Sequence, residues 1–164
     1  MLCDNISEII LVVPESRLDE IKKEIANIKK TKKVYVVSGG HRRQDSVKNG
    51  LLSVSAKSQL VCIHDGARPF VSEKLIKQSI IACSKNDGVI VANPNFDTLK
   101  ICERGYVKKT IDRNNVWMAQ TPQVFWKTKL LHAIAISEKK NMEVTDESSM
   151  MESIGYKVCV VRGD

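Results

Sequence analysis

The stretch VCIHDGARPF, residues 61–70, decides how the fold is interpreted. An apolar run stops at a charged loop that holds His64, Asp65 and Arg68, and Pro69 closes the loop. Asp, Gly and Pro end strands well, so a plain strand end is one interpretation. In open α/β sheets, however, ligands bind at the carboxyl ends of the strands. The loop therefore predicts either a simple turn or one side of a ligand-binding crevice.

Apolar runs and helical patterns alternate on both sides of this loop. Strands are expected at residues 8–14, 33–37, 59–63 and 88–92, and helices at 15–28, 45–54 and 72–86. Asp45 or Ser46 is expected near the start of the second helix, and Ser72 is the N-cap candidate of the third. This alternation, with strands that are continuously apolar, favours a mostly parallel, doubly wound α/β sheet in a single domain.

The alternation breaks after residue 92. Residues 97–111 alternate in polarity around Arg104-Gly105, which predicts a β-hairpin that protrudes as an antiparallel arm. Thr121-Pro122-Gln123 is interpreted as a polar turn, and Thr145 as the N-cap of a helix that ends at Gly155. A helix at 127–140 and a last strand at 156–161 complete the order.

Composition narrows the function classes. The net charge is +7, but the lysines are interleaved with glutamates, so a solvated surface is favoured over attraction to an anionic ligand such as phosphate. We predict no nucleic-acid partner, because no basic stripe carries aromatic residues. No apolar run approaches the roughly 20 residues that span a membrane, and no signal peptide is recognised, so the cytoplasm is expected. The five scattered cysteines predict reduced thiols rather than disulfides or a zinc site.

Chemistry-bearing residues gather in three stretches. In SGGHRRQDSVKNGL, residues 38–51, two glycines lie between a strand and a helix; they form either an anion-binding loop or a tight turn with a charged surface. Asp65 can hold a divalent cation or a sugar hydroxyl, and Arg68 can pair with phosphate, unless the two form an internal ion pair. His64 is interpreted as a packed strand-end residue. Arg113, in DRNNVWMAQTPQ, is either a phosphate ligand or a surface charge.

Five motifs together resemble one family. GGHRRQDSVKNGL, HDGARPF, DTLK, TIDRNNVWMAQTPQ and TDESSMMESIGYKV look like the 2-C-methyl-D-erythritol 4-phosphate cytidylyltransferases, in that family's order and spacing. Ribitol 5-phosphate cytidylyltransferases are the nearest alternative, but they usually read His-Asp-Ala-Val-Arg in the second motif. Gly66-Ala67 therefore favours the methylerythritol phosphate enzymes.

The resemblance implies a Rossmann-like nucleotidyltransferase fold and a homodimer through the arm region, residues 95–120. It implies transfer of the cytidylyl group from CTP to methylerythritol phosphate with Mg²⁺, releasing pyrophosphate. The positions where the family reads cytosine and ribose are Gly40, His41 and Ser46, with His41 in place of a common acidic residue. The CTP and substrate crevice matches Asp65, Gly66 and Arg68, with Asp65 as the metal ligand. The methylerythritol phosphate positions are Arg113, from the partner subunit, Thr121 and Thr145. The catalytic positions are Asp65 and Arg113.

The resemblance also bears on the two ends of the sequence. Members of the family begin with a strand and a glycine-rich loop, with an arginine and a lysine that clasp the triphosphate, and continue after the last strand with Asn-Ile-Lys. Neither stretch is among these 164 residues. We therefore expect a fragment of a longer protein or a truncated gene product, with impaired activity, because each missing preorganised donor costs about 10²–10³ in rate. A catalytically dead dimerisation module is the remaining alternative.

Overall fold

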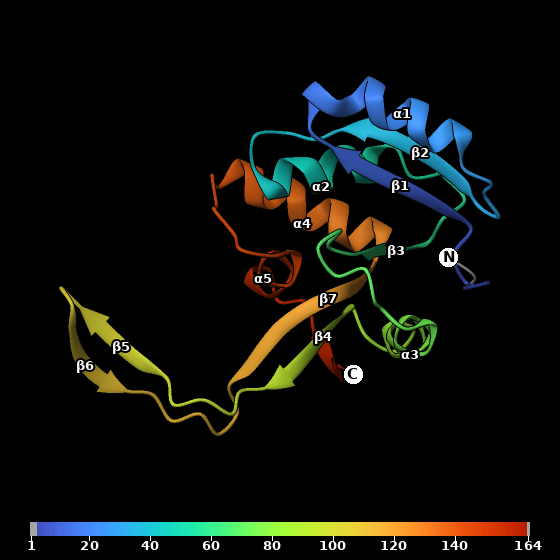
Figure 1. Cartoon of the computed structure of the whole chain (residues 1–164). Helices are drawn as coiled ribbons and strands as arrows, with labels where there is room; N and C mark the ends of the chain where they lie inside the picture. Colours follow the sequence, from blue (N-terminus) through green and yellow to red (C-terminus); the bar gives the residue numbers. More distant parts are fainter. Residues whose placement is uncertain (1–2, 164) are drawn as a thin grey trace.

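The structure is a computed structural model that describes residues 3–163, and strands and helices alternate along most of it (Figure 1). The strands are β1 Glu8–Val13, β2 Lys33–Ser38, β3 Leu60–Ile63, β4 Gly88–Pro94, β5 Lys100–Glu103, β6 Tyr106–Thr110, β7 Trp117–Trp126 and β8 Val158–Arg162. The helices are the 3-10 turn η1 Glu15–Arg17, α1 Leu18–Asn27, α2 Arg43–Leu52, α3 Glu73–Cys83, α4 Lys127–Lys139 and α5 Glu147–Ser153. The α/β class predicted from the sequence is confirmed.

The strands form two body sheets and one hairpin. Strands β1 and β2 pair in parallel, from Glu8 opposite Lys33 to Val13 opposite Ser38. A four-stranded sheet has the order β3-β7-β4-β8, in which β4 and β8 are parallel and β7 runs antiparallel to both of its neighbours. The carboxyl ends of β2 and β3 each lead into one of the loops that the sequence singled out.

The polar turn predicted at Thr121–Gln123 is wrong, because these residues lie inside strand β7. Proline has no N–H for a ladder hydrogen bond and is tolerated in sheets at bulges. The partner strand β4 shifts register between Ile90 and Val91, opposite this segment, so the sheet accommodates Pro122. Thr121 therefore has a fixed place beside the end of β3 rather than a position in a mobile turn.

The core lies between the four-stranded sheet and helices α4 and α5. Its buried members are Leu51, Val61, Phe125, Leu130, Ala133, Ile134, Met150 and Met151. Phe125 packs directly over Gly88, where an added Cβ would lie only 2.4 Å from the ring. Glycine at this position therefore lets the aromatic ring approach the neighbouring strand.

Strands β5 and β6 form the hairpin predicted from Arg104-Gly105, which extends away from the body (Figure 1). Arg104 has φ +50° and Gly105 φ +85°, the left-handed pair that a tight hairpin turn requires. Every residue of the two strands is exposed. The hairpin, defined here as residues 100–110, is thus ordered by its own ladder.

Of the two N-cap residues predicted for α3 and α5, the structure confirms one. The Ser72 hydroxyl accepts a hydrogen bond from the Leu75 N–H at 3.1 Å, which confirms Ser72 as the N-cap of α3. The prediction for Thr145 is wrong: the cap of α5 is Asp146, whose carboxylate accepts from the Ser149 N–H at 3.0 Å. Both residue types cap helices well, and the hydrogen bond selects the one that lies a residue later.

The cysteines are all free thiols, and only Cys102 is exposed. Burial raises the pKa of Cys62 to about 12 and that of Cys83 to about 11. Within residues 3–163, no helix combines the length and the apolar character that a membrane crossing needs.

Candidate functional site

The loop between β2 and α2 is folded tightly around its two glycines. The Gly39 N–H donates to the Val13 carbonyl at 2.8 Å, and the Gly40 N–H donates to the Ser46 hydroxyl at 3.0 Å. A Cβ on Gly40 would lie 2.4 Å from the Cβ of Asp45, so glycine is needed for the chain to approach the start of α2. Ser46 therefore shapes this loop, and His41 lies exposed at its rim.

The loop after β3 is held by a chain of three hydrogen bonds. The Asp65 N–H donates to the Thr121 hydroxyl at 3.1 Å, Thr121 Oγ1 lies 3.0 Å from His64 Nδ1, and His64 Nε2 lies 2.8 Å from the Arg68 carbonyl oxygen. Because a carbonyl oxygen only accepts, Nε2 carries the proton, and Nδ1 accepts from the Thr121 hydroxyl. His64 is thus a packed residue that pins the loop, as the sequence suggested.

A single arginine joins three parts of the site that are distant in sequence. Arg43, the first residue of α2, places Nη1 2.7 and 2.9 Å from the two carboxylate oxygens of Glu147, the first residue of α5. Its Nη2 lies 3.5 Å from Oδ1 of Asp65. On the other side, Arg68 Nε lies 3.8 Å from Oδ2 of Asp65. We call Arg43, His64, Asp65, Thr121 and Glu147 the crevice network.

Burial separates the two carboxylates of this network. The Glu147 side chain is only 1% exposed, whereas that of Asp65 is 40% exposed. Burial raises the pKa of Glu147 above its ordinary value, although the Arg43 guanidinium acts in the opposite direction. Glu147 therefore depends on Arg43 for a counter-charge, while Asp65 keeps a face open to a ligand.

A second polar contact supports the start of α5 from strand β7. The Gln123 amide donates to Asp146 at 2.9 Å, while its own Oε1 is buried and has no hydrogen-bond partner among the described residues. Although burial opposes ionisation, the donors Gln123, Ser148 and Ser149 hold the pKa of Asp146 below its ordinary value. The carboxylate at this cap is accordingly ionised at neutral pH.

The predicted site residues do not all meet. Asp65 and Thr121 are in contact, and Gly66 is exposed with no atom within 4 Å of an added Cβ, so it leaves open space beside Asp65. Thr145 is exposed, immediately before the cap of α5. Arg113 lies at the base of the hairpin, where its guanidinium donates to the Phe96 carbonyl oxygen. Arg113 thus belongs to the arm side of the molecule rather than to the crevice network.

Sequence reasoning missed Arg43 and Glu147. GGHRRQ contains two neighbouring arginines, and nothing in the pattern shows which of them faces inward; Arg42 instead pairs with Asp45 at 2.8 Å on the surface. Glu147 follows a helix cap, where an acidic residue is ordinary. Only the three-dimensional structure, which brings the first residue of α2 to the first residue of α5, reveals that the two side chains meet.

The crevice offers a carboxylate ligand that suits Mg²⁺. No group of three His, Cys, Asp or Glu side chains within residues 3–163 could enclose a metal. Mg²⁺, however, is commonly held by one or two carboxylates together with substrate phosphates. Asp65, half-exposed at the end of β3, is suited to that arrangement.

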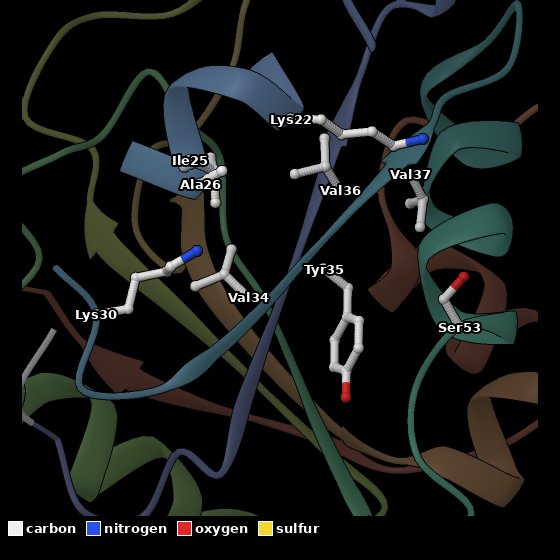
Figure 2. Close-up of a pocket in the computed structure, with 9 residues that line it drawn as sticks. All are labelled: Lys22, Ile25, Ala26, Lys30, Val34, Tyr35, Val36, Val37 and Ser53. Atoms are coloured by element: carbon white, nitrogen blue, oxygen red, sulfur yellow. The ribbon is translucent and has the colours of Figure 1, made fainter. Parts of the chain in front are cut away.

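A pocket of about 440 Å³ lies elsewhere, between α1 and β2 (Figure 2). Its lining residues are Lys22, Ile25, Ala26, Lys30, Val34, Tyr35, Val36, Val37 and Ser53. None of them belongs to the motifs or to the crevice network. The strand-end loops, rather than this pocket, are therefore the candidate site.

Comparison with known proteins agrees with the motifs. Residues 1–164 match the family model described as IspD, 2-C-methyl-D-erythritol 4-phosphate cytidylyltransferase. The curated protein of that name from Clostridioides difficile is 40% identical over 159 residues, which are 97% of this chain and 67% of that protein. The one from Syntrophus aciditrophicus is 39% identical over 160 residues, covering 96% of this chain and 68% of its own length.

Solved structures give the same answer. The 4-diphosphocytidyl-2C-methyl-D-erythritol synthase of Anaerococcus prevotii superposes with a TM-score of 0.88 at 36% identity, over 99% of this chain and 74% of that one. The 2-C-methyl-D-erythritol 4-phosphate cytidylyltransferase of Thermus thermophilus superposes with a TM-score of 0.81 at 29% identity, over 96% of this chain and 72% of that one. The fold is thus that of the Rossmann-like nucleotidyltransferases, and the chain spans about two thirds of the length of these curated relatives. The chain belongs to the 2-C-methyl-D-erythritol 4-phosphate cytidylyltransferase family.

Proposed function

We propose that this protein transfers the cytidylyl group of CTP to 2-C-methyl-D-erythritol 4-phosphate in isoprenoid precursor synthesis. The observation that carries the proposal is the meeting of two strand-end loops, 39–46 and 64–68, at Arg43 and Asp65 in a chain of this family. One loop offers backbone N–H groups and the start of a helix, and the other a carboxylate beside an arginine. Such groups suit a nucleotide and its phosphates.

The reaction is an in-line displacement at phosphorus. A phosphate oxygen of methylerythritol phosphate forms a bond to the α-phosphorus of CTP, and the bond from that phosphorus to the α,β-bridging oxygen breaks to release pyrophosphate. Such a reaction brings anions together, so it needs cations and N–H donors more than a nucleophilic side chain. The chain supplies Arg68 and Arg113 as cations for this purpose.

Each residue has a proposed role that follows from its place. Gly40, His41 and Ser46 face the cytosine and ribose at the start of α2. Asp65, Gly66 and Arg68 line the phosphate end of the crevice, where Asp65 would hold Mg²⁺. When bound, that ion would neutralise charge on the phosphates. Thr121 and Thr145 lie on the side of methylerythritol phosphate, and the cytoplasm is the proposed compartment.

The test is an assay of the complete gene product with CTP, Mg²⁺ and either methylerythritol phosphate or ribitol 5-phosphate. We expect pyrophosphate release with methylerythritol phosphate, on the order of 1 s⁻¹ or faster. A preference for ribitol 5-phosphate would replace the proposed acceptor. CTP binding without turnover of either would favour a catalytically dead module.

Arg113 gives a sharper test of the acceptor side. We expect Arg113→Ala to weaken use of methylerythritol phosphate by one to two orders of magnitude and CTP binding far less, since a charged hydrogen bond is worth about 1.5–3 kcal/mol. Arg17→Ala is the matched control, because Arg17 is an exposed arginine paired only with Glu20. Equal losses for both ligands would assign Arg113 a structural role.

We further propose that the chain forms a homodimer through the arm region, residues 95–120. Tyr106 is 80% exposed, and Val107 and Ile101 are exposed beside it, although the hairpin has no packing partner in the described chain. Apolar side chains gathered on a projecting hairpin are typical of an interaction surface. Sedimentation equilibrium should give twice the monomer mass, and Tyr106→Ser with Val107→Ser should shift the species toward the monomer.

A further inference from the structure

The crevice network contains one contact set whose purpose the proposed reaction does not explain. Arg43 is not at a position that the motifs assign to a ligand. Its side chain is half-exposed, but its Nη1 donates to the buried Glu147 carboxylate. The guanidinium is planar and offers several donors in fixed directions, so it can bind two carboxylates at once. In this fold it does so between two different loops.

The charges of this cluster alternate along a line. Glu147 is anionic and buried, Arg43 cationic, Asp65 anionic and half-exposed, and Arg68 cationic at the outer end. The contacts shorten toward the interior, from 3.8 Å at Arg68 to 3.5 Å at Asp65 and 2.7 Å at Glu147. The inner end is therefore the anchored end, and Arg43 is the nearer of the two cations to the Asp65 carboxylate.

The backbone of the Asp65 loop has a separate support. Thr121 and His64 hold its N–H and the Arg68 carbonyl, but neither touches the Asp65 carboxylate. Within residues 3–163, the charged side chains within 4 Å of those oxygens are those of Arg43 and Arg68. The direction of the carboxylate thus depends on Arg43, and the direction of Arg43 depends on Glu147.

We propose that Glu147 and Arg43 are positioning residues for Asp65. Glu147 fixes the guanidinium, and the guanidinium fixes the Asp65 carboxylate in the direction that the nucleotide phosphates require. The role of these two residues in the reaction rests on the proposed function. The same arginine ties the start of α2, the end of β3 and the start of α5 together, so the nucleotide and acceptor sides of the crevice share one anchor.

Arg43→Lys is the decisive variant, because lysine keeps a charge for Glu147 but has no second nitrogen for Asp65. We expect its thermal midpoint to stay near that of the native protein while kcat falls about tenfold or more and KM for both substrates changes little, since misplacing a reacting group can cost up to about 10²-fold. Glu147→Gln should lower kcat similarly. The kcat of the double variant should be no lower than that of the less active single variant, because the two residues act as one unit.

Glu138→Gln is the matched control. Glu138, in α4, pairs at 2.5 Å with Lys48, which lies in α2 like Arg43; both side chains of this pair are part-exposed, and neither contacts a member of the crevice network. The kcat of Glu138→Gln should equal the native value. Native kcat in Arg43→Lys, or losses that multiply in the double variant, would overturn the proposal.

A readout without turnover separates this inference from the proposed function. The Arg68 N–H donates to the Asp65 carbonyl oxygen at 3.0 Å, so its hydrogen exchange reports the order of the loop. We expect faster exchange at residues 64–68 in Arg43→Lys and Glu147→Gln, and native exchange in Glu138→Gln. An inactive native protein would remove the proposed function and leave this measurement standing; unchanged exchange in both variants would remove the inference.

Discussion

The crevice network and the hairpin differ in where their partners lie. In the network, Arg43, Asp65 and Thr121 each contact a residue from another element, and the buried Glu147 has its counter-charge inside the chain. In the hairpin, every strand residue is exposed, and the packing is confined to the other strand of the pair. One region is organised before any ligand arrives, whereas the other presents side chains that this chain leaves uncovered.

This difference teaches how the two regions respond to change. Altering a network residue leaves a buried polar or charged group without a partner, and this lowers the free energy of unfolding. Altering a hairpin residue removes contacts only from the two strands themselves, so the body is unaffected. The three substitutions below test that contrast, each against a counterpart that is as similar as the chain allows.

The largest loss of stability is expected for Arg43→Met. Removing the cation leaves the Glu147 carboxylate buried without its counter-charge, and such losses reach about 3–5 kcal/mol. We expect the lower end, because Arg43 itself is half-exposed. Urea unfolding, with Arg17→Met as the exposed counterpart, measures the effect.

The same variant has a predictable pH dependence. Burial already raises the folded-state pKa of Glu147, so its contribution to stability is full below the ordinary pKa and is lost as the pH rises through the folded-state pKa. Without Arg43 that pKa rises further. The deficit of Arg43→Met should therefore grow as the pH rises from the ordinary carboxyl pKa toward neutrality; a deficit that does not change with pH would mean that the Glu147 charge is not its cause.

A smaller loss of stability is expected for Thr121→Val, which keeps the shape of the side chain and deletes its hydroxyl. The Asp65 N–H and His64 Nδ1 both lose their partner, at a cost of about 1–3 kcal/mol. Thr110→Val is the counterpart on the hairpin, where the hydroxyl accepts only from exposed Lys100 at 2.7 Å. That change should stay within about 0.5 kcal/mol in the same denaturation experiment. Equal losses would erase the contrast between the regions.

The smallest effect on global unfolding is expected for Gly105→Ala. Alanine is strained at φ +85°, by roughly 1–2 kcal/mol, but the strain is released by local opening of the hairpin. Hydrogen exchange should therefore speed up at residues 100–110 while the global midpoint stays unchanged. Gly88→Ala is the counterpart in the body, where the new Cβ collides with Phe125 and about 1–3 kcal/mol is lost. A lower global midpoint for Gly105→Ala would show that the hairpin unfolds with the body.

Local patterns predicted much of the fold. The helical spacing of Leu18, Ile21 and Ile25 lies in α1, the Arg104-Gly105 pair forms the hairpin turn, and Ser72 caps α3. These features depend on residues close in sequence. The placement of Thr121 within β7 was missed because a register shift on the partner strand accommodates Pro122, and no pattern in the segment itself records that shift.

The candidate site was predicted only in part, because some of its contacts join residues that are distant in sequence. Asp65 and the two glycines stand out because they interrupt apolar or helical patterns at strand ends. The pairing of Arg43 with Glu147 spans 104 residues and depends on how α2 meets α5. Each residue has an ordinary local explanation, a surface arginine and a helix-start acid, so only the three-dimensional arrangement distinguishes them.

The distribution of thiols makes the hairpin a natural attachment point for a reporter group. Cys102 is the exposed cysteine, paired across the ladder with Val107. Cys3 and Cys83 are buried, and burial raises the pKa of the partly buried Cys62 and Cys159. Thiol reagents act on the thiolate, so an alkylating dye selects Cys102 in the folded chain without any cysteine being replaced. A fluorophore placed there lies beside the uncovered apolar side chains and reads out, by its emission, whatever comes to cover them.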